Sequence, residues 1–296
     1  MTGGILVIDK PVGITSHNVI SKLRYLLDEQ KIGHCGTLDP MASGILPIMV
    51  GKAVKASEYL VDHDKRYFAG IKLGITTDTQ DMTGNIISQY GGDLPTFGEF
   101  SEVLPQFTGE IEQTPPMYSA LKVGGIKLVN LARDGITVER KPRKVTISSC
   151  VPSQKDGKYF LDIKCSKGTY IRTLCADIGK ALGCGACMES LDRTEVGRFT
   201  KDDAIPFDSL NDMTIDEIKE KMIPVDRMFD SLPSAYLNSF FLNLYRNGEK
   251  IKLSKLKFID PAKGDLWRIY YKDRFHSLGT ITEIDGCNYF CMKKLF

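Results

Sequence analysis

The stretch from Gly33 to Pro47, which reads Gly-His-Cys-Gly-Thr-Leu-Asp-Pro-Met-Ala-Ser-Gly-Ile-Leu-Pro, constrains the fold of this chain more than any other. It holds three glycines and two prolines within fifteen residues. Glycine adopts backbone angles that other residues avoid, whereas proline fixes its own angle and removes a hydrogen-bond donor. The stretch therefore predicts a shaped loop rather than a long helix or a regular strand.

This loop contains one carboxylate, Asp39, and one imidazole, His34. Aspartate commonly caps helices and turns, and the composition of the loop alone favours a surface turn in which Asp39 is such a cap. A second interpretation is that the loop aims a single catalytic acid, because catalytic groups often sit on loops that a rigid scaffold positions. The rest of the chain has to decide between them.

The composition is that of an ordinary globular protein with a sizeable core. The chain has 296 residues, of which 42% are hydrophobic and 26% charged, and its net charge is +2. This length leaves room for two domains. We find no apolar run long enough to cross a membrane and no secretory signal, and we therefore expect a cytoplasmic protein with reduced thiols. Nothing in the sequence calls for an oligomer, and we expect a monomer.

Four of the eight cysteines raise the question of a metal site. Cys184 and Cys187 have the spacing of metal ligands, and Cys287 and Cys291 could complete a set of four. The second pair has three intervening residues and no flanking histidine, which favours packed or surface thiols over zinc. We predict no metal.

The apolar patterns predict interleaved strands and helices. Strands are expected at 5–8, 65–74, 85–87, 145–147 and 159–165, and helices at 16–27, 51–60, 96–107 and 170–179. Most strand segments alternate in polarity, and strands and helices do not alternate strictly. We therefore predict an α+β fold with a mixed, largely antiparallel central sheet flanked by helices.

A small β-rich module is expected at the end of the chain. A helix is predicted over 236–245, and short strands over 267–270, 278–281 and 288–292. Leu232-Pro233-Ser234 is the expected boundary, which divides the chain into domains 1–232 and 233–296.

Six stretches resemble the bacterial tRNA pseudouridine-55 synthases of the TruB type and occur in the family's order. They are residues 7–16, 33–46, 65–67, 77–84, 113–122 and 167–174. The likeness extends to about residue 200, and the last part of the chain resembles loosely the PUA-like RNA-binding module of such enzymes. Each motif alone is a weak signal, but the ordered set is strong.

The resemblance implies the pseudouridine synthase fold and an RNA-modifying isomerase. Such enzymes flip a uridine (U55) out of the T-loop of tRNA, detach the uracil from its ribose, turn it and rejoin it through carbon. They use no metal, nucleotide or redox cofactor. By position, Asp39 is the indispensable aspartate, which must be ionised either to attack as a nucleophile or to take a proton from the sugar.

Two further residues match catalytic positions of the family. Tyr67 corresponds to the tyrosine that stacks on the base and can handle a proton. Arg172 corresponds to the arginine that pairs with the catalytic carboxylate and favours its charged form. Without the ordered motifs, a core aromatic and a surface helix arginine would be the simpler interpretations.

Further positions of the resemblance concern RNA. His34 matches the residue that fills the space vacated in the RNA, a task for which an aromatic ring is suited. Leu191 matches an apolar residue of the base pocket, and Gly36 belongs to the glycines that would let an RNA backbone come close.

Lys10, Pro11 and Lys55 match family positions near the site whose roles are less defined. Lys10 either supports the loop or touches phosphate, and Lys55 is expected to act electrostatically.

The chain also departs from the family pattern. Asp192 replaces an arginine, which puts a phosphate contact there in doubt. Val129 stands where an aromatic is usual, within a thumb-like segment at about 105–145 that is expected to close over RNA. Cys35 stands where threonine is common.

Two other functions compete with a stand-alone tRNA enzyme. One is an RNA-binding or RNA-folding protein with a vestigial site, against which the set Asp39, Tyr67 and Arg172 argues. The other is a guide-RNA-dependent relative, which usually has basic tails and a fuller C-terminal module.

Overall fold

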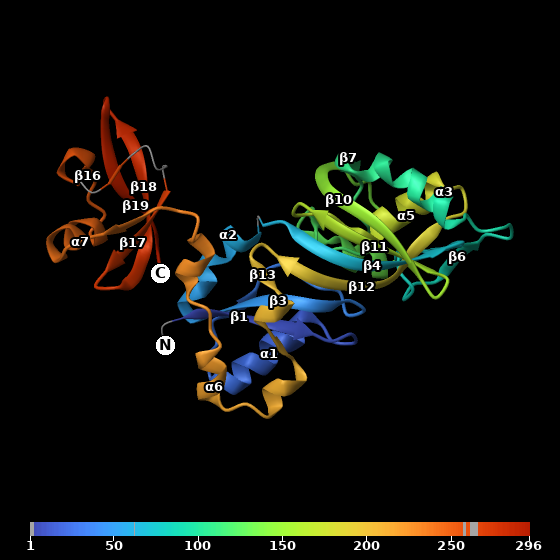
Figure 1. Cartoon of the computed structure of the whole chain (residues 1–296), viewed down its shortest axis with the longest axis horizontal. Helices are drawn as coiled ribbons and strands as arrows, with labels where there is room; N and C mark the ends of the chain where they lie inside the picture. The colour runs from blue at the N-terminus through green and yellow to red at the C-terminus, as the bar shows by residue number, and fades with distance from the viewer. Residues whose placement is uncertain (1–2, 62, 257–258, 261–265) are drawn as a thin grey trace.

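The computed structural model describes residues 3–296 except 62, 257–258 and 261–265, and its strands form two main sheets. All strands of the larger sheet lie between Gly4 and Pro206, and all strands of the smaller one lie between Ser234 and Leu295. Figure 1 shows the smaller sheet at one end of the molecule, beside the edge of the larger one that holds β1 and β3.

The larger sheet confirms the predicted mixed, largely antiparallel topology. Only β1 with β14 and β3 with β12 pair in parallel, and the other pairs are antiparallel. Along the sheet the order is β14 (Ala204–Pro206), β1 (Gly4–Lys10), β3 (Ser43–Val50), β12 (Ala186–Val196), β4 (Lys65–Leu73), β11 (Lys158–Cys165), β10 (Arg143–Lys155) and β7 (Gly109–Gln113). Strand β2 (Ile32–His34) pairs with β3, and β13 (Phe199–Thr200) pairs with β12.

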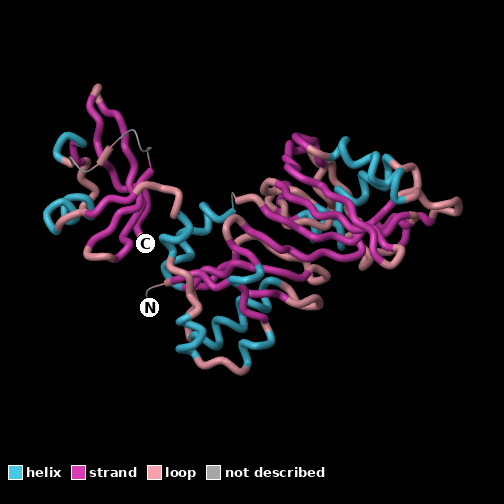
Figure 2. The backbone as a smooth tube through the Cα atoms, in the orientation of Figure 1, coloured by secondary structure: helices cyan, strands magenta, loops and turns pink. Residues whose placement is uncertain are grey.

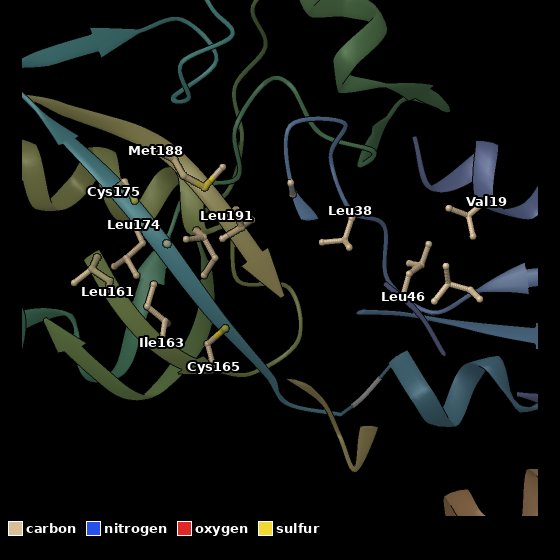
Figure 3. Packing of buried hydrophobic residues seen from close by; sticks show 14 of the residues in the cluster. Val19, Leu38, Leu46, Leu161, Ile163, Cys165, Leu174, Cys175, Met188 and Leu191 are labelled. Atoms are coloured by element: carbon tan, nitrogen blue, oxygen red, sulfur yellow. The ribbon is translucent and has the colours of Figure 1, made fainter. Parts of the chain in front are cut away.

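Two helices cover one face of this sheet in separate places. Helix α1 (Ser16–Leu27) is capped by Thr15, whose side chain accepts from the Asn18 amide in a capping box, and it packs on β1 and β2. Helix α5 (Ile171–Ala181) packs on β12 and β4. Figure 3 shows Val19, Leu38 and Leu46 of the core on the α1 side and Leu161, Ile163 and Leu174 on the other side. The loop that begins at Gly33 crosses between these two groups.

Strand β3 corrects the expectation that the stretch from Gly33 to Pro47 contains no regular strand. Ser43–Val50 is a strand although it includes Gly44 and Pro47. Gly44 is tolerated because β12 approaches so closely that a side chain would collide with its backbone. Pro47 is tolerated because its carbonyl accepts from the Cys35 amide on the β2 side, where no further strand needs its missing N–H.

Strand β12 was not predicted. Its sequence, ACMESLDRTEV, mixes charged and apolar residues without clean alternation, and register shifts after Met188 and Arg193 break its pattern. The pairing of β12 with β3 and β4 nevertheless makes it a central strand. Tertiary contacts over long sequence distances, rather than local propensity, therefore make this segment a strand.

Two predicted helices are shorter than expected. Over 51–60 the chain forms a 3-10 helix (Gly51–Ala56) followed by α2 (Ser57–Val61). Over 96–107 it forms α3 (Phe97–Val103) and a 3-10 helix (Leu104–Phe107), where Pro105 cannot continue the α-helical hydrogen bonds.

Two small hairpins project from the larger sheet. Strands β5 (Ile75–Thr77) and β6 (Ile86–Gln89) form one, and β8 (Lys122–Val123) and β9 (Ile126–Lys127) form the other, with Gly124 and Gly125 in its turn. Helix α4 (Leu128–Arg133) follows β9. The thumb-like segment thus contains β7, this second hairpin and α4.

Beyond Pro206 the chain passes through short helices to the second sheet. These are 3-10 helices at Asp208–Asn211 and Val225–Phe229 and the α-helix α6 (Ile215–Glu220). The second sheet has the order β15 (Ser234–Tyr236), β17 (Leu266–Tyr271), β18 (Arg274–Ile284), β19 (Cys287–Leu295) and β16 (Ile251–Lys252). Helix α7 (Ser239–Arg246) starts three residues later than expected. Figure 2 shows that strands dominate both parts.

None of the helices in the described ranges is long and apolar enough to cross a membrane.

Candidate active site

A cavity of about 460 Å³ opens on the helix-covered face of the larger sheet. Residues from five places line it: the loop before β3, strands β4 and β12, the thumb-like segment and the turn before α5. The lining includes Gly36, Asp39, Lys65, Tyr67, Tyr118, Ser119, Lys127, Val129, Lys167, Arg172, Leu191 and Arg193. Asp39, Tyr67, Arg172, Leu191 and Gly36 of the sequence-predicted residues therefore share one cavity.

Asp39 and Arg172 form an ion pair in this cavity. Nη2 of Arg172 lies 3.0 Å from Oδ2 of Asp39, and the Arg172 side chain is 8% exposed whereas that of Asp39 is 41% exposed. The carboxylate thus faces the open space, while its cationic partner is held inside the protein. Coulomb attraction across this short distance holds the carboxylate against the guanidinium.

Asp81 and two backbone carbonyls fix Arg172 from the other side. Nη1 of Arg172 lies 3.5 Å from Oδ2 of Asp81 and donates to the carbonyl of Thr79, and Nη2 donates to that of Tyr118. Asp81 is itself 5% exposed and accepts from the Thr83 amide. Asp81 belongs to the matched stretch 77–84, but the sequence did not predict a role for it.

The N-terminus of α5 is held by a buried glutamine of β7. The side-chain amide of Gln113 donates to the Tyr170 carbonyl, at 3.0 Å, and its oxygen accepts from the Tyr170 amide, at 2.7 Å. These bonds replace the missing side-chain cap of α5. They fix the first turn, and with it Arg172.

Tyr67 reaches the cavity from β4 and packs against the core. Burial raises the pKa of its phenol, and the guanidinium of Arg193 opposes this by its charge and a hydrogen bond. The phenol is therefore protonated at neutral pH. Its ring offers a flat apolar surface beside Asp39.

Lys10 is fully buried and does not line the cavity. Its Nζ donates to the carbonyls of Pro11, Ile14 and Ala42, at 2.9, 2.9 and 2.5 Å. Burial lowers the pKa of this ammonium to about 8, against the attraction of Asp39. The sequence left two roles open for Lys10. These contacts favour a structural role, in which Lys10 supports the loop, over a contact with an RNA phosphate.

His34 and Lys55 lie outside the cavity lining. His34 ends β2, and within the described ranges its buried Nδ1 has no hydrogen-bond partner. Burial and the charge of Arg193 lower the pKa of His34, which therefore has a neutral ring at pH 7. Lys55 donates to the Leu295 carbonyl of β19 and so joins the two parts of the chain.

Asp192 makes a local network at the position where the family pattern has an arginine. Its carboxylate accepts from the Ser43 hydroxyl at 3.1 Å and lies 2.6 Å from Nζ of Lys201. The substituted residue therefore links β12 to the start of β3. The neighbouring Arg193, to which no role was given from the sequence, is buried and lines the cavity.

No cluster of His, Cys, Asp and Glu side chains that could hold a metal is found among the residues with described positions. Cys184 and Cys187 are buried beside or in β12, whereas Cys287 and Cys291 belong to β19 of the other sheet. The four cysteines are thus not one cluster.

Comparisons with known proteins show which family the chain resembles. Residues 24–171 match the family model described as TruB family pseudouridylate synthase (N terminal domain), and residues 172–235 match the model described as tRNA pseudouridylate synthase B C-terminal domain. A tRNA pseudouridine synthase B of Clostridium kluyveri is 42% identical, with 99% of each chain covered. The protein of the same name from Dechloromonas aromatica is 45% identical, with 84% of each chain covered.

Solved structures show the same fold over nearly the whole chain. The crystal structure of a Cbf5-Nop10-Gar1 complex matches with a TM-score of 0.70 and 25% identity, and covers 99% of this chain and 84% of that chain. An H/ACA RNP bound to a substrate RNA containing 2'-deoxyuridine matches equally well, with 23% identity and the same coverage.

Proposed function

Because the chain belongs to the TruB family of pseudouridylate synthases, we propose that it isomerises the T-loop uridine of tRNA (U55) to pseudouridine. The observation that supports this most directly is the ion pair of Asp39 and Arg172 in a cavity that Tyr67 also lines. The curated relatives named above bear the name of a tRNA enzyme, and their length matches that of this chain.

The reaction breaks one bond and forms another without adding atoms. The bond between N1 of uracil and C1′ of ribose breaks, the ring turns, and C5 bonds to C1′. The proton of C5 is lost to solvent, and N1 gains one. Isomerisation therefore needs a group that promotes cleavage, a surface that retains the free ring and a path for these protons.

We assign these tasks to three residues. Asp39 acts on the sugar or the base as a nucleophile, or removes a sugar proton, and Arg172 holds it in place as a carboxylate. Tyr67 stacks on the ring and retains it while it turns, because its aromatic side chain lines the same cavity as the carboxylate. Leu191, also in the cavity, supplies an apolar wall for the base.

The flipped uridine leaves a gap in the RNA, and we assign His34 to it. Its neutral ring can stack between bases. Lys10 and Pro11 maintain the shape of the loop through the carbonyls that Lys10 binds, and Gly36 forms part of the cavity wall. Lys55 supports the contact between the two parts of the chain.

The decisive experiment is Asp39→Asn with tRNA that contains tritium at C5 of uridine. Release of tritium should fall by about 100-fold or more, because the amide can neither attack nor accept a proton. Binding of tRNA should persist, and Asp212→Asn, an exposed matched change, should leave both unchanged. Wild-type tritium release by Asp39→Asn would refute the proposal.

We further propose that the protein acts in the cytoplasm as a monomer of two domains, 1–232 and 233–296, the second binding RNA. Analytical ultracentrifugation of the free protein and of its tRNA complex tests the oligomeric state. We expect the mass of one chain for the free protein and the mass of one chain plus one tRNA for the complex.

A further inference from the structure

Arg193 is a buried cation without the usual counter-charge. Its side chain is 1% exposed, and no carboxylate lies within ion-pair distance of it in the described parts of the chain. Arg172, by contrast, faces both Asp39 and Asp81. Burying a guanidinium without a carboxylate partner costs free energy, so its presence here points to a specific role.

The donors of Arg193 go to the two ends of the loop that holds Asp39. Its Nε donates to the Ile45 carbonyl at 2.9 Å, and its Nη2 donates to the Gly36 carbonyl at 3.1 Å. These carbonyls precede and follow Asp39 in the chain. Because a guanidinium is planar and rigid, one side chain fixes the separation and orientation of both carbonyls.

Strand register places the same side chain beside Tyr67. In β12, Arg193 pairs with Gly44 of β3 on one side and with Tyr67 of β4 on the other. Directly paired residues on neighbouring strands point to the same face of a sheet. The charge and hydrogen bond of Arg193 also oppose the rise that burial causes in the pKa of Tyr67.

Glycines on both sides make room for this arrangement. A β-carbon at Gly44 would lie 2.3 Å from the Arg193 carbonyl oxygen, and one at Gly36 would lie 3.3 Å from Nη1 of Arg193. Arg193 of the same chain thus occupies space beside both glycines.

We propose that Arg193 is a positioning residue that ties the loop of Asp39 to Tyr67, so that the carboxylate and the stacking ring keep one fixed geometry. This inference rests on the proposed function. In this role Arg193 acts through the loop and through Tyr67, and it does not need to contact the reacting atoms. Lysine cannot replace it fully, because one ammonium cannot present the same planar set of donors.

The test compares Arg193→Met and Arg193→Lys with a matched control, Arg198→Met. Arg198 is an exposed arginine that also donates to a backbone carbonyl. Under single-turnover conditions with saturating tRNA, the rate constant should fall by about 100-fold for Arg193→Met and about 10-fold for Arg193→Lys. The dissociation constant for tRNA should change by less than about threefold, and the control should match wild type.

A second readout detects the link to Tyr67 without RNA. In protein labelled with fluorotyrosine, the fluorine resonance of Tyr67, assigned with Tyr67→Phe, should titrate at higher pH in Arg193→Met. Arg193→Lys should keep most of the wild-type titration, because it retains the charge. A role in stability alone would lower the melting temperature but would not reproduce this pattern of charge dependence.

Three results would overturn the inference: wild-type rates in both variants, a rate loss matched by an equal loss of tRNA affinity, or an unchanged Tyr67 titration in Arg193→Met. If Arg193→Met does not fold, Arg193→Lys decides by its rate alone. Pseudouridine formation by the wild-type protein in the same assay tests the proposed function separately. The Tyr67 titration is measured without RNA, so its result is valid whether or not the protein modifies tRNA.

Discussion

At the scale of single residues, the cavity depends on how Arg172 is held. The guanidinium lies between Asp39, which is partly open to the cavity, and Asp81, which is buried. A fixed position for the cation fixes the exposed carboxylate in turn. We therefore expect the buried carboxylate to affect the reaction although it does not line the cavity.

Asp81→Asn should slow the reaction and leave tRNA binding intact. The amide oxygen can still accept from Thr83, but the charge facing Arg172 is lost. The rate at saturating tRNA should fall by about 10-fold, which corresponds to about 1.4 kcal/mol of lost ion-pair stabilisation. Rapid-quench measurements give the rate, with the exposed Asp93→Asn as control. Equal rates for both variants would contradict this.

Lys10 should give the protein a distinctive dependence on pH. Its pKa is about 8 in the folded protein, against 10.5 for an ordinary lysine. The unfolded chain therefore binds more protons than the native state between these values, and stability rises with pH in that window. Below about pH 8 the buried ammonium is charged in both states, and its contribution does not change with pH.

The measurement compares urea unfolding of wild type and Lys10→Met from pH 7 to 10.5. The stability of wild type relative to the variant should be constant below about pH 8 and should rise above it, by at most about 3 kcal/mol. A difference that stays flat or falls over this range would show that Lys10 does not titrate as a buried group.

At the scale of elements, β3 and β12 approach each other closely at Gly44. Gly44 has φ +106°, and a β-carbon there would lie 2.3 Å and 2.5 Å from the Arg193 carbonyl oxygen and amide nitrogen. Both atoms belong to the backbone and cannot rotate away. The parallel pairing of β3 with β12 thus depends on glycine at this position.

Gly44→Ala should destabilise the fold by at least about 2 kcal/mol, through collision and an unfavourable backbone angle. Urea unfolding measures this. Gly91→Ala is the matched control, since no atom lies within 4 Å of its added carbon and its φ is not in the left-handed region. Equal stability of the two variants would show that β12 can move away without cost.

At the scale of the whole molecule, an aromatic cluster joins the two sheets. Phe229, before the second sheet, packs on Tyr59 with ring centroids 5.2 Å apart, and on Phe275 and Phe296 of the second part at 6.1 and 6.0 Å. Nearby, Lys294 of β19 pairs with Glu58 at 2.7 Å. These contacts fix the small sheet beside the edge that holds β1 and β3 (Figure 1).

Phe229→Ala should loosen this contact and lower the free energy of unfolding by about 3–5 kcal/mol. Limited proteolysis should then cut the chain between the two sheets before either sheet is digested. Phe240→Ala, which removes a ring that is 64% exposed, is the control. Unchanged protease resistance in Phe229→Ala would show that other contacts suffice.

Much of the fold was predictable because its signals are local. The apolar periods of α1 and α5 and the alternation in β4 and β11 require only neighbouring residues, and these elements are confirmed within one or two residues. The mixed sheet followed from the interleaving of such segments. The resemblance brought Asp39, Tyr67 and Arg172 together, and their roles stay predictions.

The predictions that failed concern contacts between segments that are far apart in the chain. Pro47 and Gly44 suggested a loop, yet pairing with β1 and β12 makes a strand there, and β12 has no clean alternation of its own. The hydrogen bond from Lys55 to β19 likewise joins segments that are far apart in the chain. Spacing along a chain does not show which strands become neighbours.

The sequence by itself determined the local elements, the family and the acid in the loop from Gly33. Only the tertiary structure decided which residues, beyond Arg172, support the loop that holds that acid. Lys10, Gly44, Arg193 and Tyr67 follow one another across β1, β3, β12 and β4, although they come from four distant parts of the chain. The physical reason is that strand pairing and burial are chosen by the whole folded chain. A charge such as Arg193 becomes informative only once its surroundings are known.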